Sequence, residues 1–545
     1  MNRNTESHFS INPTNLDIQR SSFKRPYNVK TTFNAGDLIP VYVDEVLPGD
    51  TCQMDLSTVT RMSTPIFPVM DNAYMDYYFF FVPTRLCWEH WREFNGENRT
   101  TFWEQETEYE IPQLTAPKGG WEKGTLIDYF GIPTKTEGIS INALPLRAYA
   151  LIWNEWFRNE NLKQPCMINL DDATIEGSNG NNYITDVQKG GKPAKVAKYA
   201  DYFTSCLPEP QKGPDVLLPL GQSAPVIGSV GSMALSVYDG IGTKLNDSSL
   251  YSATSPNRLI LMEPEPNTGA RANIIDDPAK TTVFADLSAA TGATINQLRQ
   301  AFAIQRLYEK DARGGTRYTE VIKAHFGVTS PDSRLQRPEY LGGTRITINV
   351  DQVIQTSATD TTKTPQGNTA AYSLTTMSNH MFTKSFTEHG YIIGLACVRT
   401  DHTYQQGIER MWSRKKRFDF YWPTLANISE QGVLNKEIYA TGTAKDEEVF
   451  GYQEAWAEYR YKPNKVTGAF RSNYQNTLDS WHYADYYTDQ PYLSSNWNDE
   501  TKANINRTIA VQDELEDQFI SDMFFDTTWV RPMPVYSIPG LIDHH

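Results

Sequence analysis

The strand-like segments of this chain fall into two sets, one toward each end, with helices and polar stretches between them. In the first set, "TCQMDLST" alternates Cys52, Met54 and Leu56 with polar neighbours. In the second, "TRITINVDQV" places Ile346 and Ile348 on one face in the same way. Such alternation is typical of strands with one face in a core. Neither set can close a core alone, so we predict a mainly β fold in which they pair across the middle, as in a jelly roll with inserted connections.

Other segments add strands of different kinds. "DLIPVYVDEV" is expected to place Ile39, Val41 and Val43 on one face of a strand. "AYMDYYFFFV" and "HGYIIGLACVRT" are apolar on both faces, which is typical of strands covered on both sides. "KKRFDFYW" and "WAEYRYKP" are rich in aromatic residues, so we predict that they are strands as well.

Helices are predicted where the apolar spacing changes to three and four. Within Asp76–Glu97, Pro83 ends a strand, apolar residues then recur at helical spacing, and Gly96 lies where a helix C-cap belongs. "LPLRAYALIWNEWFRNEN" is expected to form a helix with Pro145 near its start. "TINQLRQAFAIQRLYEKDARGG" opens with a capping box and ends in two glycines.

Three polar stretches, about 172–198, 222–292 and 355–378, interrupt these elements. We predict that they are long exposed insertions, which often carry recognition. Residues 1–30 have no periodicity and are predicted to form a mildly basic arm. Its basic residues are Arg3, Arg20, Lys24, Arg25 and Lys30.

The chain of 545 residues has a formal charge of -15, which excludes an overall electrostatic footprint for wrapping nucleic acid. Any contact with DNA must therefore be local. The basic arm and the cluster "SRKKR" are the candidates, although such a cluster is also typical of the solvent face of a strand. The cluster consists of Arg414, Lys415, Lys416 and Arg417.

No sequence motif indicates an enzyme, a cofactor or a metal site. The nine histidines do not cluster at metal-ligand spacing. The five cysteines are widely spaced and include no C-x-x-C pair, so we predict reduced, buried thiols in a protein made in a cytosol. No run of about 18 apolar residues is present, and we expect no membrane insertion.

The tryptophans leave two functions open. In a carbohydrate-active β protein, those at 88–103 would be sugar platforms, and two of the 65 Asp and Glu would be acid and base. Aromatic residues at helical spacing are, however, more typical of a core or of an interface with another chain.

Several long segments together resemble the major capsid protein of gokushoviruses, small tailless bacteriophages of the microvirus family. They include "RMSTPIFPVMDNAYMDYYFFFVPTRLCWEHWREFNGE", "RQAFAIQRLYEKDARGGTRYTEVIKAHFGV" and "YQQGIERMWSRKKRFDFYWPTLANISEQ". They occur in the family's order and cover most of the chain. The segments that do not match are 172–198, about 225–290, 355–378 and the region after about 484.

The resemblance implies an eight-stranded antiparallel jelly roll spanning 1–545, with copies closing a T=1 icosahedral shell around circular single-stranded DNA. Residues 222–292 would form the threefold surface protrusion that meets a host receptor. The resemblance also implies that the protein is located in the virion, which would be assembled in the bacterial cytoplasm with an internal scaffolding protein and a DNA pilot protein.

Two further expectations follow for a capsid subunit. Because an acidic chain supplies few cations for a genome, we expect a separate small basic DNA-binding protein, or metal ions, inside the particle. Interfaces between subunits are rich in aromatic residues, which makes the tryptophans candidates for contacts between copies. The candidates are Trp88, Trp91, Trp103, Trp121, Trp456 and Trp481.

Overall fold

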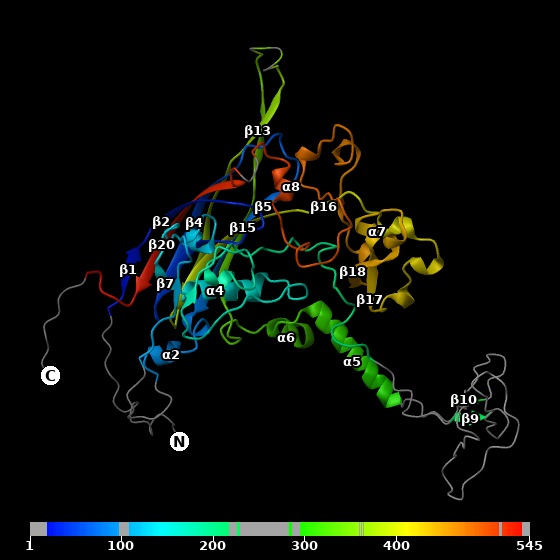
Figure 1. Cartoon of the computed structure of the whole chain (residues 1–545), viewed down its shortest axis with the longest axis horizontal. Coiled ribbons are helices and arrows are strands. Elements are labelled where there is room, and N and C mark those ends of the chain that lie inside the picture. Colours follow the sequence, from blue (N-terminus) through cyan, green and yellow to red (C-terminus); the bar gives the residue numbers. More distant parts are fainter. Residues whose placement is uncertain are drawn as a thin grey trace, which may run out of the picture. The chain divides into compact units, whose positions relative to one another are not determined.

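Antiparallel strands make up most of the regular structure of the protein (Figure 1). The computed structural model describes residues 19–97, 108–216, 226–228, 283–285, 295–358, 360, 362, 365–511 and 515–536. The chain divides into two compact units, Gly213–Tyr308 and the remainder. In the smaller unit, β9 (Val226–Gly228) pairs with β10 (Val283–Ala285).

The larger unit is built on two antiparallel sheets. In the first, β2 (Tyr27–Phe33), β20 (Phe519–Arg531), β4 (Thr51–Met62) and β14 (Thr375–Ser385) are neighbours in that order, and β1 (Ser21–Lys24) also pairs with β20. In the second, the order is β11 (Glu339–Thr347), β5 (Ala73–Pro83), β15 (Gly390–Thr400) and β3 (Ile39–Val46). Early and late strands are therefore neighbours in both sheets, which confirms the predicted pairing across the middle of the chain.

The two sheets enclose a first hydrophobic core. The ring of Phe79 on β5 lies 5.7 Å from that of Phe382 on β14 and 6.4 Å from that of Phe525 on β20. On β4, the alternating Cys52 and Met54 are fully buried, as their spacing predicts. Burial of apolar area at this seam is the main force that holds the sheets together.

A second core covers the opposite face of the second sheet. Phe80 and Val82 point away from the first core and join this second one, together with helix α4 (Leu144–Ile152). The prediction that β5 is apolar on both faces because both are covered is thus confirmed. Helix α4 begins with Pro145 in its first turn and continues into a π-helix, Trp153–Phe157.

Three insertions between the main strands carry the remaining elements. The first, between β5 and β11, contains α2 (Trp91–Phe94), β6 (Gln113–Thr115), α3 (Leu126–Tyr129), β7 (Ser140–Asn142), β8 (Ile175–Glu176), α5 (Ile295–Gly314) and α6 (Tyr318–Phe326). The second contains the hairpin β12 (Val350–Ile354) and β13 (Thr369–Ser373). The third, between β15 and β20, contains β16 (Thr403–Tyr404), β17 (Glu430–Leu434), α7 (Asn435–Ile438), β18 (Val449–Glu454), β19 (Asn464–Lys465) and α8 (Ala503–Asn506).

Some predicted elements were wrong. "KKRFDFYW" and "WAEYRYKP" are not strands but contain the 3-10 turns Arg417–Asp419 and Ala457–Tyr459. The predicted helix before Gly96 is a 3-10 turn, Thr84–Leu86, followed by the single turn α2. Val43 does not share a face with Ile39, because the register of β3 against β15 shifts between Tyr42 and Pro40. Such a bulge adds one residue and reverses the alternation.

Candidate interaction surface

Two segments of the third insertion, 408–426 and 456–466, lie side by side and form what we call the basic aromatic surface. The guanidinium of Arg414 lies 3.0 Å from the carboxylate of Glu458, and the ammonium of Lys465 lies 2.8 Å from that of Glu409. Together the two segments contain eight Lys and Arg but three Asp and Glu, in a chain of net charge -15. The surface is therefore a basic island on an acidic protein.

The turn that presents the basic cluster is held by Asp419. Its carboxylate accepts hydrogen bonds of 2.7 Å from the backbone N–H groups of both Lys415 and Lys416. These backbone bonds lower the pKa of Asp419. With its backbone donors satisfied in this way, the segment forms a turn in place of the predicted strand, and both lysine side chains remain exposed.

Trp456 is the buried residue on which the aromatic side chains of this surface pack. It is 3% exposed, has the left-handed backbone angle φ +67°, and its indole N–H donates to the Leu425 carbonyl at 2.9 Å. The rings of Tyr421 and Tyr459 pack on it, with centroids 5.8 and 6.4 Å away. A left-handed conformation at a non-glycine residue is strained, and the surrounding contacts hold it in place.

The same two segments also carry large apolar side chains that are exposed. Trp412 is 72% exposed and Phe418 is 70% exposed. Arginines lie over neighbouring rings, with Arg417 4.8 Å from the Trp422 centroid and Arg414 4.5 Å from that of Tyr459. Exposed apolar groups gathered in one place mark interaction sites. Other exposed large side chains of this surface are Met411, Phe420, Tyr421, Trp422, Tyr459 and Tyr461.

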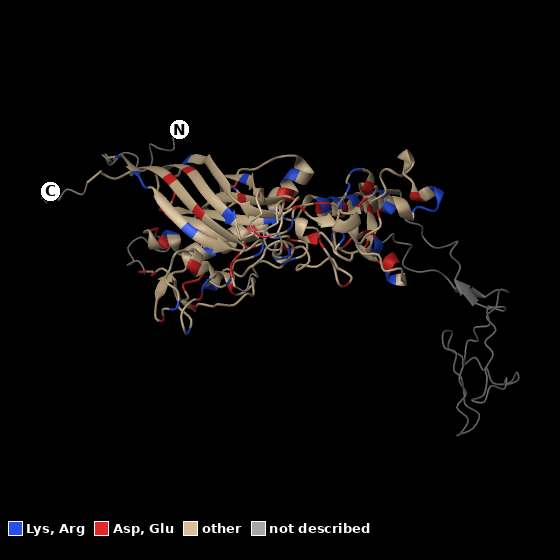
Figure 2. Cartoon of the chain, turned by 90° about the horizontal axis from the view of Figure 1, so that it is seen from above, with Lys and Arg blue, Asp and Glu red and all other residues tan. Residues whose placement is uncertain are grey.

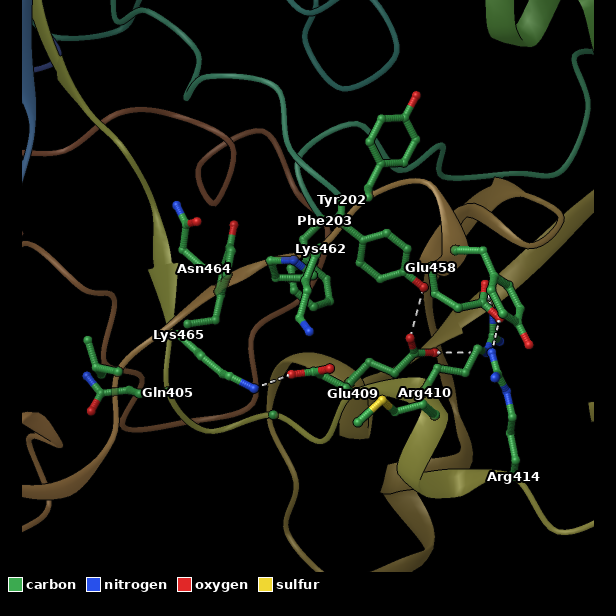
Figure 3. A pocket seen from close by; sticks show the side chains of 18 of the residues that line it. Tyr202, Phe203, Gln405, Glu409, Arg410, Arg414, Glu458, Lys462, Asn464 and Lys465 are labelled. Carbon is green, nitrogen blue, oxygen red and sulfur yellow. Dashed lines mark hydrogen bonds and ion pairs between the residues drawn. The ribbon is translucent and has the colours of Figure 1, made fainter. Parts of the chain in front are cut away.

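A pocket of about 240 Å³ opens beside these rings (Figure 3). At its wall the buried carboxylate of Glu437 accepts a hydrogen bond of 2.9 Å from the Tyr202 hydroxyl and lies 3.5 Å from Arg410. Burial raises the pKa of Glu437, and Arg410 opposes this effect. Arg410 also approaches Glu458 at 3.9 Å, and Glu458 is paired with Arg414, so two arginines face two carboxylates in this wall. Lys462, Asn464 and Lys465 line the pocket as well (Figure 3).

The structure does not bring the two predicted basic groups together. Arg20, Lys24, Arg25 and Lys30 lie at the β1–β2 edge of the first sheet, whereas Arg414 to Arg417 lie in the third insertion. Arg25 forms an ion pair with Asp44 at 2.6 Å, and Lys30 one with Asp522 at 3.3 Å. Acidic and basic residues are interspersed along the strands (Figure 2). The part of the expected arm from residue 21 to residue 30 therefore belongs to the first sheet, because β1 and β2 pair with β20.

The tryptophans predicted as contacts between copies occupy different environments. Trp88 and Trp121 are fully buried in the second core, and Trp456 is the buried residue of the basic aromatic surface described above. In this conformation these three side chains have no exposed face for a neighbouring copy. Trp91 and Trp481 are half-buried, and both remain candidates.

Several predictions lie outside the described residues. These are Arg3, Trp103, residues 1–18 of the arm and, except for β9 and β10, the insertion 222–292. The five cysteines are all described, free and buried, which confirms the prediction of reduced thiols. Burial raises the pKa of Cys52 and Cys397 to about 12. Among the described residues, no helix is long and apolar enough to cross a membrane, and no group of three or more His, Cys, Asp or Glu side chains is arranged so that it could hold a metal ion.

Sequence reasoning missed a buried charged cluster around His402. Its ring nitrogens lie 2.8 Å from Asp485 and 3.1 Å from Glu500, and all three side chains are almost completely buried. No local spacing connects these residues in the sequence. It also missed the exposed rings of Trp412 and Phe418, for which the alternation of aromatic and basic residues in "MWSRKKRFDFYW" was an available signal.

Comparison with known proteins gives a consistent result. The family model described as "Capsid protein (F protein)" matches residues 12–541. The "Capsid protein VP1" of Spiroplasma virus 4 is 45% identical over 533 residues, covering 96% of both chains. The proteins of the same name from Bdellovibrio phage phiMH2K and Chlamydia phage 1 are 43% and 41% identical, and the matches cover at least 98% of each chain.

Proposed function

Because the chain belongs to the capsid protein (F protein) family, and is therefore a structural protein of a phage virion and not an enzyme, we propose that identical copies assemble into a T=1 icosahedral shell around a circular single-stranded DNA genome. The observation that carries this proposal is the match, at 41% to 45% identity and nearly full length, to three phage proteins named capsid protein VP1. A shell of one kind of subunit requires contacts that close geometrically.

We further propose that the eight long strands form a jelly roll. In chain order they are β2, β3, β4, β5, β11, β14, β15 and β20, four in each sheet. Every connection except that from β5 to β11 passes from one sheet to the other, as the two Greek keys of a jelly roll require. The packing of both sheets on one core supports the same arrangement.

The genome would meet this acidic subunit only locally. The β1–β2 edge and the basic aromatic surface supply the cations, with Lys24, Lys415 and Lys416 exposed. Most of the phosphate charge would be neutralised by a separate small basic protein or by metal ions, because the subunit itself is acidic. A scaffolding protein and a DNA pilot protein would complete the assembly.

Residues 222–292 are proposed as the surface protrusion that meets the host receptor. This stretch is rich in Ser, Thr, Ala and Gly, and lies within the longest insertion between two neighbouring strands of a sheet. Insertions of this kind carry recognition because their sequence is not constrained by the core. Deletion of 229–282 should leave shells intact and abolish adsorption to host cells.

The main proposal is tested by expressing the full chain with its genome and viewing the product by negative-stain electron microscopy. We expect closed particles of one size that protect single-stranded DNA from nuclease. Purified chain that stayed monomeric under all assembly conditions, with or without the partner proteins, would contradict the shell. Particles that protect duplex DNA or RNA would contradict the genome type alone.

A further inference from the structure

We propose that the exposed rings of the basic aromatic surface stack on the bases of single-stranded DNA, while the adjacent cations hold its phosphates. This inference rests on the proposed enclosure of a single-stranded genome and names residues that would contact it. The rings are Trp412, Phe418 and Tyr461, which are 72%, 70% and 51% exposed. The cations are Lys415, Lys416 and Arg417.

The exposed rings have faces available for a ligand. Within the described part of the chain, Trp412, Phe418 and Tyr461 have no ring or cation packed over them, whereas Trp422 and Tyr459 are covered by arginines. Each base has a flat π face, and stacking on an aromatic side chain is independent of sequence. A duplex cannot offer these faces because its bases already stack on one another. The surface therefore suits an unpaired strand.

Charge supports DNA as the occupant, because a DNA strand has a negative charge at every nucleotide, whereas a second copy of this chain carries 50 Lys and Arg alongside its 65 Asp and Glu. The surface has an excess of five positive charges, which attracts a polyanion. Two of its three carboxylates are already neutralised within the chain: Glu458 by Arg414 and Glu409 by Lys465. Lys415 and Lys416 are held beside Phe418 by the turn at Asp419, so a cation and an exposed ring are presented together. Nucleic-acid grooves for single strands combine these two elements.

The test is fluorescence anisotropy with the full-length unassembled chain and three probes of equal charge: a 12-residue oligo(dT), an abasic strand of the same length, and a duplex hairpin. We expect oligo(dT) to bind at least tenfold more tightly than either of the other probes. The double variant Trp412→Ala/Phe418→Ala should strongly reduce this difference, because only Tyr461 of the three rings remains, and should leave binding of the abasic strand unchanged. Tyr492→Ala, which removes a comparably exposed ring elsewhere (61% exposed), should leave the binding of all three probes unchanged.

A charge variant separates stacking from phosphate contact. Lys415→Gln/Lys416→Gln should weaken the binding of oligo(dT) and of the abasic strand to the same degree. It should also lower the slope of the logarithm of the binding constant against the logarithm of the salt concentration by about 0.7 for each charge removed. Circular dichroism checks that every variant is folded. The conservative variant Trp412→Tyr still carries an aromatic ring, so it should keep the preference for oligo(dT) that Trp412→Ala/Phe418→Ala largely loses.

Each other outcome overturns the proposal in a recognisable way. If oligo(dT) and the abasic strand bound equally well, the proposed contact with phosphates would stand but the proposed stacking on bases would be contradicted. Absence of binding to all probes would remove DNA contact from this surface while leaving shell formation, which is scored separately by microscopy, untouched. If the ring variant bound oligo(dT) normally but no longer assembled, the rings would belong to a contact between copies.

Discussion

His402 Nδ1 lies 2.8 Å from a carboxylate oxygen of Asp485, a residue 83 positions away, and both side chains are buried. Burial alone would lower the pKa of His402, but Asp485 and Glu500 outweigh it and raise that pKa to about 10. At neutral pH the imidazolium therefore faces two buried carboxylates, and Lys198, 3.6 Å from Asp485, supplies a second positive charge. Since the cluster connects β15 to the segment before β20, it fastens the third insertion to the sheet.

Stability should depend on this proton. Because the folded pKa of His402 lies above its ordinary value of 6.5, its stabilising contribution is complete below about pH 6.5 and is lost as the pH rises through about 10. The melting temperature of the wild-type subunit should fall over this window. In His402→Gln the fall should be smaller. Equal slopes in the two proteins would contradict the assignment.

Removal of the imidazole should also be costly at neutral pH. His402→Ala would leave Asp485 and Glu500 buried with one cationic partner fewer, and we expect a loss of about 3 to 5 kcal/mol in the free energy of unfolding. Lys198, 3.6 Å from Asp485, would compensate in part. Denaturant unfolding measures the loss, with the exposed pair His380 and Asp55 as a control: His380→Ala should cost less than about 1 kcal/mol.

Asp76 should make the fold sensitive to acid. Burial tends to raise its pKa, but ion pairs with Arg345 at 2.7 Å and Arg399 at 2.5 Å prevail and lower it. For a carboxylate with a lowered pKa, the stabilising contribution is present above the ordinary value of 3.8 and is lost as the pH falls below it. Asp76→Asn should reduce this acid dependence, and titration monitored by tryptophan fluorescence would detect it. An unchanged acid midpoint would contradict the prediction.

Two tryptophans should differ sharply in what they stabilise. Trp88 is fully buried and its indole N–H donates to Asp172, whereas Trp412 is 72% exposed. Trp88→Ala should lower the free energy of unfolding of the unassembled subunit by about 3 to 5 kcal/mol because it opens a cavity. Trp412→Ala should change it by less than about 0.5 kcal/mol. Thermal and denaturant unfolding measure both losses, and losses of similar size for the two variants would contradict the placement of these residues.

The cations of the β1–β2 edge should affect packaging. Replacing all four with glutamine should lower the amount of DNA per particle, since phosphate contacts would be lost. A matched control replaces four exposed lysines elsewhere, and it should package normally. Ultraviolet absorbance of purified particles gives the ratio of DNA to protein; equal ratios for the two variants would remove this edge from the genome contact. The edge residues are Arg20, Lys24, Arg25 and Lys30, and the control residues are Lys118, Lys135, Lys310 and Lys445.

Local patterns predicted much of the two main sheets because burial itself is periodic. Alternation identified β4, and apolar residues on both faces identified β5 and β15, since those strands are covered on two sides. The same reasoning missed β20, although Phe519, Met523 and Trp529 share one buried face. Its hydrophobic alternation is broken, because Ser521 and Thr527 are buried while Ile520 and Phe524 are exposed, and its partners lie at the other end of the chain.

The third insertion was less predictable. The aromatic residues of "KKRFDFYW" and "WAEYRYKP" have the propensity of strands, but propensity depends on whether a sheet is available to accept them. Here Asp419 and the packing around Trp456 stabilise turns instead. The His402 cluster was unpredictable for a related reason: its members come from distant positions, and only the folded chain places them together.

The position of β20 has a consequence for how the protein is made. This strand lies between β2 and β4, and near its start Thr32 donates a hydrogen bond to Asp517, 485 residues further along the chain. On a ribosome that adds roughly 5 to 20 residues per second, the amino-terminal strands must wait roughly half a minute or longer for their neighbour. A nascent or truncated polypeptide therefore lacks the middle of a sheet, and only a subunit translated almost to its end has two complete sheets with which to join a growing particle.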